Sequence, residues 1–318
     1  AWVSEGRGGT ACQNVGNATG GYGTTSALQG CWDIFGREGG PNVSWVVSCL
    51  PYFEEQAYYD QWNFDIRAQD QDGPNDPNPR ADGTAIHSDS IASLICPSDI
   101  AKGPESNYDG TGAIQQFPQA GSRGGFAKGN YATYPSVVHV DHFKQYAGAL
   151  GGYKVGDRVG QKIGKVADGV SKTLVIVEVR ALDRPGDSRG AWALPWPGSS
   201  AVALDWHPDN DADNLWRPSL SFNPDDVAFP NTQTYFDVMI GAQDHVDYAS
   251  RAKMPFRSFN QGGGFMGAAP RSSHPGGINC AGLDGSVGFL SDAIDSATYG
   301  YLVAARDGQP SDVTEFVK

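Results

Sequence analysis

The sequence lacks any apolar run that approaches the ~20 residues of a membrane-spanning helix, so no such helix is expected within it. Basic residues are scarce as well: 23 Lys and Arg stand against 36 Asp and Glu, which gives a net charge of −13. A nucleic-acid partner needs clustered Lys and Arg to displace phosphate counterions, so no nucleic-acid binding is predicted. The chain begins at Ala1 without a methionine or a signal peptide, and we expect that an upstream segment was processed or lost.

Familiar catalytic and zinc-binding patterns are also missing. No Gly-x-Ser-x-Gly motif supplies an activated nucleophile, so a hydrolase that uses His274 with Asp284 is the least favoured hypothesis. Among the six histidines, His139 and His142 are three residues apart, but no second pair of ligands follows at a zinc-site spacing. The sequence therefore predicts a protein without catalytic residues, that is, not an enzyme.

Long helices are disfavoured by 42 glycines and 20 prolines, which imply many turns and irregular loops. Hydrophobic residues make up 39% of the chain, which is enough for a core. We therefore expect an α+β fold with an antiparallel sheet packed on helix, in a single domain over residues 1–318. Within it, residues 1–43 should form a looped N-terminal segment, and residues 184–235 a loop insertion rich in Trp and Asp.

Five cysteines leave one odd thiol if the others pair. Cys12 and Cys31 bracket a loop rich in Gly, Thr and Ser and form the preferred disulfide, with Cys49 and Cys96 as the second candidate pair. Either bond would indicate an oxidising compartment. The alternative is that the cysteines are buried free thiols that act as small hydrophobic residues.

Residues 273–290 contain the most informative pattern of the chain. Nine residues separate His274 from the pair Asp284-Gly285, and apolar runs flank that pair. A two-residue Asp-Gly loop accepts positive φ at both positions, so the pattern predicts a tight antiparallel hairpin. We expect His274 to form a hydrogen bond that fixes this hairpin to its neighbour, rather than to act as a catalytic partner of Asp284.

Three further elements are predicted from local patterns. Apolar spacing and a proline suited to a first turn predict a helix over residues 51–61. The β-branched run over residues 174–179 predicts a buried strand. Ser296 is expected to cap a helix over residues 297–306, with Gly308 beyond its end.

Five segments of the chain resemble, in the same order, the DUF1559 family of planctomycete pilin-like proteins, whose C-terminal signature is His-x9-Asp-Gly. The signature positions here are His274, Gly276, Gly277, Asp284 and Gly285. The other four segments are residues 44–63, Cys96-Pro97-Ser98-Asp99, Asn130-Tyr131 and residues 167–178. Arg271 departs from the family pattern, in which an arginine usually directly precedes the histidine.

The resemblance implies a globular head like that of a pilin or of a pseudopilin of a secretion system. The sheet of this head would pack on the helix around Phe53 and on an N-terminal pilin helix, which we do not find in this sequence. It also implies an exported structural subunit of a filament in the periplasm, at the cell surface or outside the cell. Partners would be further copies or other pilin-like subunits, and membrane contact would come only through the missing helix. No catalytic role is attached to the signature.

An acidic segment supplies the candidate cofactor site, for Ca²⁺. Alternate aspartates can direct hard oxygen ligands at one ion; the candidate ligands are Asp205, Asp209, Asp211 and Asp213. The segment is not an EF-hand, because Leu220 stands where a bidentate glutamate belongs. The alternative is a solvated acidic turn, and residues 70–82 are a weaker calcium candidate.

Tryptophans in loops rich in Pro and Gly suggest a second function. Such side chains stack on sugar rings, although they also commonly cover a small core beneath long loops. The candidates for glycan stacking are Trp192, Trp196, Trp206 and Trp216. Together with calcium, they define the alternative hypothesis of a secreted, calcium-dependent carbohydrate-binding module.

Overall fold

The structure is a computed structural model in which part of the chain is described. The described residues are 43–66, 68, 71, 76, 79–99, 103–108, 125–137, 147–151, 154–155, 158–159, 161–181, 183, 185, 189–194, 198–204, 256–257, 267–268, 270–309 and 316–317. Residues 1–42 of the looped segment expected over residues 1–43, Cys12 and Cys31 among them, lie outside the described part of the chain. In the described residues, no helix combines the length and the apolar character needed to cross a membrane.

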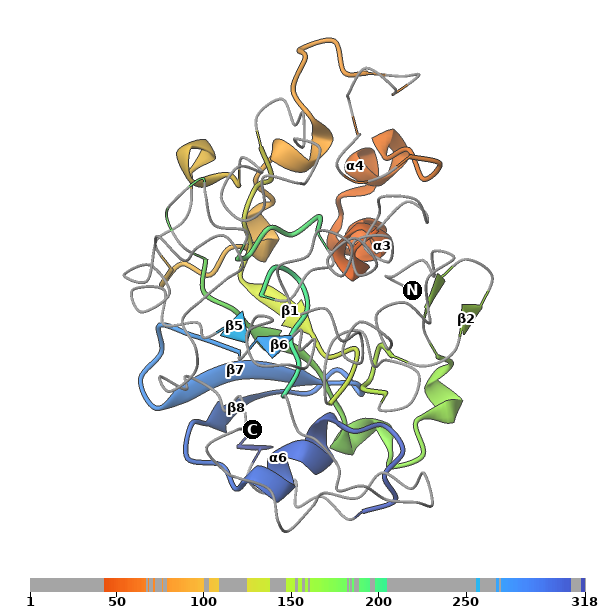
Figure 1. The fold of residues 1–318 in the computed structure, drawn as a ribbon, viewed down its shortest axis with the longest axis vertical. Helices are drawn as coiled ribbons and strands as arrows, with labels where there is room; N and C mark the ends of the chain where they lie inside the picture. The colour runs from red at the N-terminus through yellow and green to blue at the C-terminus, as the bar shows by residue number, and fades with distance from the viewer. Residues whose placement is uncertain are drawn as a thin grey trace, which may run out of the picture.

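The main sheet is open, antiparallel and five-stranded, in the order β1-β4-β7-β8-β9 (Figure 1). Its strands are β1 Tyr131–Thr133, β4 Leu174–Glu178, β7 Gly277–Gly282, β8 Val287–Ser291 and β9 Phe316–Val317. Two small ladders pair β2 Lys154–Val155 with β3 Arg158–Val159, and β5 Phe256–Arg257 with β6 Gly267–Ala268. The predicted buried strand is present as β4.

The described helices are few and short. The α-helices are α3 Trp45–Cys49, α4 Gln56–Gln61 and α6 Ser296–Val303. The 3-10 helices are η1 Leu50–Phe53, η3 Ile86–Ser88, η4 Ala92–Leu94, η5 Pro104–Ser106, η6 Ile163–Lys165 and η7 Val170–Lys172. The fold is therefore mixed α+β with an antiparallel sheet, as the sequence predicted.

The single helix predicted over residues 51–61 is wrong, because the chain breaks at Glu54. Glu54 has φ 65°, a left-handed conformation that ends η1 before α4 begins. The helical segment also starts earlier than predicted, at Trp45, where the Ser44 hydroxyl accepts a hydrogen bond from the Val47 amide (3.4 Å). No residue of α4 is buried, so Ala57 does not continue the apolar stripe.

Helix α6 also differs from its prediction at both ends. Its N-cap is Asp295 rather than Ser296, because the Asp295 carboxylate accepts from the Thr298 amide (3.0 Å). The helix stops at Val303, since Ala304 is extended and pairs with Gly148 in an isolated bridge. The predicted helix over residues 297–306 is therefore shorter at its C-terminal end.

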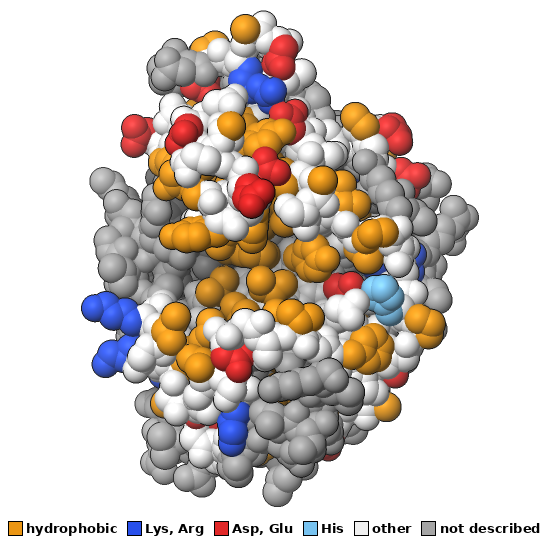
Figure 2. All heavy atoms as spheres, turned by 180° about the vertical axis from the view of Figure 1, so that it is seen from behind, with side chains coloured by type: hydrophobic (Ala, Val, Ile, Leu, Met, Phe, Trp, Pro, Cys, Tyr) orange, Lys and Arg blue, Asp and Glu red, His pale blue; other side chains and the backbone are white. Residues whose placement is uncertain are grey.

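Two clusters of buried hydrophobic residues lie on either side of the sheet. Helix α6 packs against one face, where Tyr299 and Leu302 join Ile278, Cys280 and Leu290 in one cluster. Helix α3 belongs to the other cluster, which also holds Trp62 and Trp192. In Figure 1 the sheet separates α6, at the bottom, from α3 and α4 above. On the face seen in Figure 2, hydrophobic side chains gather in a band across the middle of the molecule.

The predicted hairpin forms from β7 and β8, but three residues rather than two lie between its last hydrogen-bonded pair, Gly282 and Ser286. The Gly282 amide donates to the Ser286 carbonyl (2.8 Å), and the Gly285 amide donates to the Gly282 carbonyl (3.0 Å). This is a turn followed by a left-handed glycine, with φ 85° at Gly285. Asp284 does not have a positive φ. Among the described non-glycine residues, Glu54 alone has one. Asp284 instead accepts from the Ser286 amide (2.9 Å) and hydroxyl (2.6 Å).

The two glycines after His274, Gly276 and Gly277, are each required for a different structural reason. Gly276 has φ 79°, which favours glycine at the entry to β7. At Gly277, a Cβ would lie 2.2 Å from the Leu290 carbonyl oxygen and 2.6 Å from the Phe289 ring. The second glycine is therefore required because strand β8 approaches its backbone closely.

We predict that Gly285→Val lowers the free energy of unfolding by about 1–2 kcal/mol, because a β-branched residue resists the left-handed conformation. Denaturant unfolding of both proteins measures the difference. Gly164→Val is the matched control, since Gly164 has no positive φ and no neighbouring atom lies within 4 Å of the place where its Cβ would be. Equal losses in the two variants would contradict the turn geometry.

His87 is a fully buried histidine of η3 that packs against the segment preceding β1. Its ring stacks on Phe126 with centroids 3.9 Å apart, and Nδ1 lies 2.9 Å from the Gly125 carbonyl oxygen. Burial lowers the pKa of His87 to about 4, because the loss of solvation outweighs the opposing effect of the Gly125 hydrogen bond. The ring is therefore neutral near neutral pH, with Nδ1–H as the donor.

This burial predicts a specific dependence of stability on pH. Between about pH 6.5 and pH 4 the unfolded chain protonates His87 and the folded chain does not, so stability is lost as the pH falls through this window. The loss is about 3 kcal/mol at its limit, from roughly 1.4 kcal/mol per pKa unit. His87→Gln, which keeps a donor for Gly125, should remove this part of the slope in urea unfolding at several pH values. An unchanged slope would show that His87 does not titrate as described.

Candidate functional site

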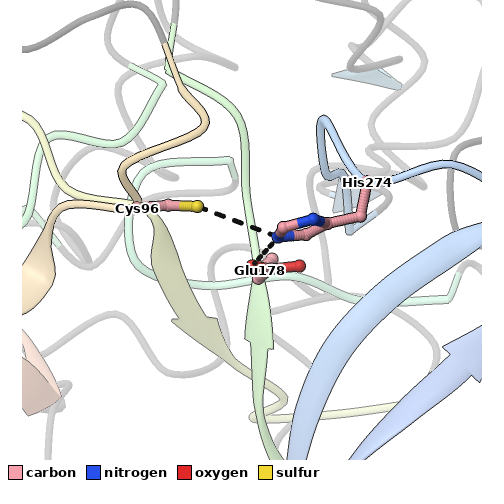
Figure 3. A group of neighbouring side chains, drawn as sticks. All are labelled: Cys96, Glu178 and His274. Carbon is pink, nitrogen blue, oxygen red and sulfur yellow. Dashed lines mark hydrogen bonds and ion pairs between the residues drawn. The ribbon is translucent and has the colours of Figure 1, made fainter.

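The side chain of His274 lies where three distant segments meet (Figure 3). Its Nε2 atom is 3.3 Å from the Glu178 carboxylate and 3.9 Å from the Cys96 sulfur. His274 precedes β7, whereas Asp284 lies beyond the other end of that strand. The expected contact between His274 and a neighbouring strand is therefore present, and its partner is Glu178 of β4.

Glu178 is the last residue of β4, and its side chain is only 4% exposed. Its carboxylate accepts from the Asn279 amide (2.7 Å) and from the Asn279 side chain (3.1 Å). Its backbone carbonyl accepts from the Arg271 amide (2.8 Å). One residue of β4 thus holds the chain both before and within β7.

Cys96 is placed by a turn that docks onto the same end of β4. The Asp99 amide donates to the Cys96 carbonyl (3.0 Å), which closes the turn over Cys96-Pro97-Ser98-Asp99. The Cys96 amide donates to the side-chain oxygen of Asn130 (2.8 Å). The Asn130 amide group donates in turn to the Val179 carbonyl (3.0 Å) and to the Asp99 carboxylate.

Asp99 is buried and completes this polar network. Its carboxylate accepts from the Ala181 amide (2.8 Å) and lies 3.8 Å from Nε of Arg180. A buried carboxylate without such partners would carry a large desolvation penalty. A small, partly open hollow adjoins the network, lined by Cys96, Asp99, Asn130, Glu178, Val179, Arg180, Arg271, Ser272 and Ser273.

The three clustered side chains do not have the geometry of a nucleophile–base–acid triad. In such a triad the nucleophile and the carboxylate contact different ring nitrogens of the histidine. Here Cys96 and Glu178 both contact Nε2 of His274 (Figure 3). The arrangement can hold an ion or hydrogen bonds at one centre, but it does not relay a proton across the ring.

The candidate disulfide between Cys49 and Cys96 is wrong, because both are free thiols and Cys96 faces His274 instead. Cys280, on β7, is also free. Burial, and secondarily the negative charge of Glu178, raises the pKa of Cys280 to about 12. Cys280 is therefore a neutral, inert thiol that lies 3.5 Å from the Gly288 carbonyl oxygen.

Trp192 does not provide a glycan-stacking surface, because it is only 2% exposed. Its indole N–H donates to the Asp89 carbonyl (3.1 Å), and its ring lies 6.2 Å from that of Trp62 between centroids. It is a core residue, which is the alternative that the sequence left open. The other stacking candidates and the calcium candidates lie outside the described residues: Trp196, Trp206, Trp216, Asp205, Asp209, Asp211 and Asp213.

The partners of His274 were not predicted from the sequence. Cys96 was considered only for a disulfide, and Glu178, Asp99 and Asn130 were given no role. A signal was nevertheless present, because each of these residues lies in one of the segments that resemble the DUF1559 family. Arg271 also reaches the site through its backbone, although two serines separate it from His274.

The model of the family described as protein of unknown function (DUF1559) matches residues 13–297. The chain belongs to this family. No curated protein and no solved structure matches the chain.

The buried network predicts that Asn130→Ala destabilises the protein by about 2–4 kcal/mol, because it leaves the Cys96 amide and the Val179 carbonyl without a partner. Thermal and urea unfolding provide the measurement. Gln61→Ala is the control: this exposed amide donates only to the Ala57 carbonyl one turn earlier in its helix (2.8 Å), and its loss should cost under about 0.5 kcal/mol. Similar losses in both variants would show that the network is not a special source of stability.

Proposed function

We propose that this chain forms the globular head of an exported, non-enzymatic, pilin-like subunit that assembles with further copies or with other pilin-like subunits. Membership of the DUF1559 family supports this proposal. The observation that carries it is the unequal covering of the two faces of the sheet. One face packs on α6, and the other becomes exposed toward β8.

The strand register identifies the side chains on the open face. Val177 pairs with Cys280 and lies on the α6 side, so Ile176 and its partner Ala281 lie on the opposite side. Ala281 pairs in turn with Val287. Along this apolar row, Ile176 and Ala281 are half-buried, whereas Val287 is 69% exposed.

An apolar row that becomes exposed at its β8 end is a surface that a helix or another subunit can cover. Pilin-type assembly requires such a surface, because a long apolar helix packs on the sheet of the head. The hydrophobic band across the middle of the face in Figure 2 also favours association over a purely solvated surface.

Non-enzymatic function is part of the proposal. It is supported by the Cys96, Glu178 and His274 cluster, whose two contacts fall on one ring nitrogen and so lack triad geometry. The alternative of a calcium-dependent carbohydrate-binding module has no described observation in its favour. Trp192 is buried, and its other candidate residues lie outside the described part of the chain.

The apolar row that ends at Val287 predicts that Val287→Asp reduces assembly at least about tenfold, which corresponds to roughly 1.4 kcal/mol. The reason is that assembly would bury the new charge in the contact between subunits. The measurement is immunogold electron microscopy of cells that carry the full-length gene, together with cross-linking to count assembled subunits. The variant protein should melt as the parent does, because Val287 is exposed.

Ile163→Asp is the matched control, since Ile163 is 63% exposed but lies in η6, outside the sheet. It should assemble as the parent protein does. The proposal fails if antibodies find the chain only as dispersed monomers, or if the two aspartate variants assemble equally well.

A further inference from the structure

We infer that Cys96, Glu178 and His274 form a binding site for one Zn²⁺ ion. Their ligand atoms lie within 4.8 Å of one another, and each side chain offers a donor that zinc accepts. The inference rests on this geometry and does not depend on the pilin-like assembly.

Both separations from the His274 nitrogen are close to those of tetrahedral zinc. With Zn–N and Zn–O bonds of about 2.0–2.1 Å and a Zn–S bond of about 2.3 Å, tetrahedral ligands lie about 3.3 Å (N to O) and about 3.6 Å (N to S) apart. The observed separations are 3.3 Å from His274 to Glu178 and 3.9 Å from His274 to Cys96. The third separation, from the Cys96 sulfur to the Glu178 carboxylate, is within 4.8 Å, and small side-chain rotations would bring all three atoms to bonding distance of one ion.

Hydrogen bonding alone does not account for both contacts of the histidine. Nε2 carries one proton at most, so it can donate either to the Glu178 carboxylate or to the Cys96 sulfur, but not well to both. If the thiol donates to Nε2 instead, the lone pair is used and the carboxylate faces no proton. A metal ion replaces these competing contacts by three bonds directed at one centre.

The set of donor atoms selects the kind of metal. A thiolate with an imidazole and a carboxylate suits zinc, whereas Ca²⁺ and Mg²⁺ take oxygen ligands. The surrounding contacts already hold the ligands in place: Asn279 binds the Glu178 carboxylate, and Asn130 binds the Cys96 amide. The adjoining hollow gives room for a water molecule as the fourth ligand.

Zinc at this point would join three segments that are far apart in the sequence. It would connect the turn at Cys96, the end of β4 at Glu178 and the entry to the β7–β8 hairpin at His274. The ion would therefore stabilise the folded state, because the unfolded chain does not hold these ligands together.

The test uses the purified, metal-stripped chain and the metal alone. Isothermal titration with Zn²⁺ should give one site, elemental analysis after dialysis should give one zinc per chain, and the melting temperature should rise with zinc but not with Ca²⁺. Co²⁺ in place of zinc should give a thiolate-to-cobalt charge-transfer band in the near ultraviolet, which reports the Cys96 bond directly.

Single substitutions then assign the site. Cys96→Ser and His274→Ala should each weaken zinc binding at least about a hundredfold, since each removes one of three ligands, and Cys96→Ser should abolish the cobalt band. Cys49→Ser is the matched control, a free thiol outside the cluster, and should bind zinc as the parent does.

If Cys96→Ser does not fold, zinc binding by His274→Ala tests the site instead, because the His274 side chain is 31% exposed and its truncation disturbs the core less than a change at buried Cys96. The inference is overturned if the parent chain binds no zinc. It is equally overturned if Cys49→Ser weakens binding as much as the cluster variants do, or if cobalt binds without a thiolate band.

Discussion

The arrangement of the sheet around the site depends on the contacts that the Glu178 carboxylate makes with neighbouring segments. This carboxylate is buried at the end of β4 and accepts two hydrogen bonds from Asn279 of β7 while it contacts His274. A buried carboxylate is stable only with such partners, so the position of β7 relative to β4 is coupled to the satisfaction of this one group. Removing the partners would leave a charge without compensation in the interior.

Strand β4 and the segment that precedes it hold the β7–β8 hairpin at both ends. At the loop end, the Leu283 amide donates to the Thr173 carbonyl (2.8 Å) and the Asp284 amide to the Val170 carbonyl (3.1 Å). At the open end, Glu178 binds Asn279. The segment that precedes β4 and the residue that ends it therefore fix the position of the hairpin against β4, which in turn places His274 beside Cys96.

How much the sequence predicts depends on the range of the interactions involved. The hairpin and strand β4 follow from local patterns, an Asp-Gly turn and a β-branched run, and the structure contains both. The break at Glu54 does not follow, because the apolar spacing continues across it and the left-handed conformation leaves no compositional trace. The partners of His274 are equally hidden, since Cys96 is 178 residues away in the sequence.

The same distinction explains the errors at Cys49 and Trp192. Spacing suggests which cysteines and tryptophans are available, but burial and neighbours decide what they do. Because the described helices and strands are short, few hydrogen bonds within these elements hold the described part of the fold together. Polar contacts between distant loops then contribute much of the specificity. The segments that resemble the DUF1559 family form this set of contacts, with Asn130 and Glu178 linking the Cys96 turn to the hairpin. The family signature is therefore best understood as the two ends of one hairpin, one end bound to Glu178 and the other to the turn before β4.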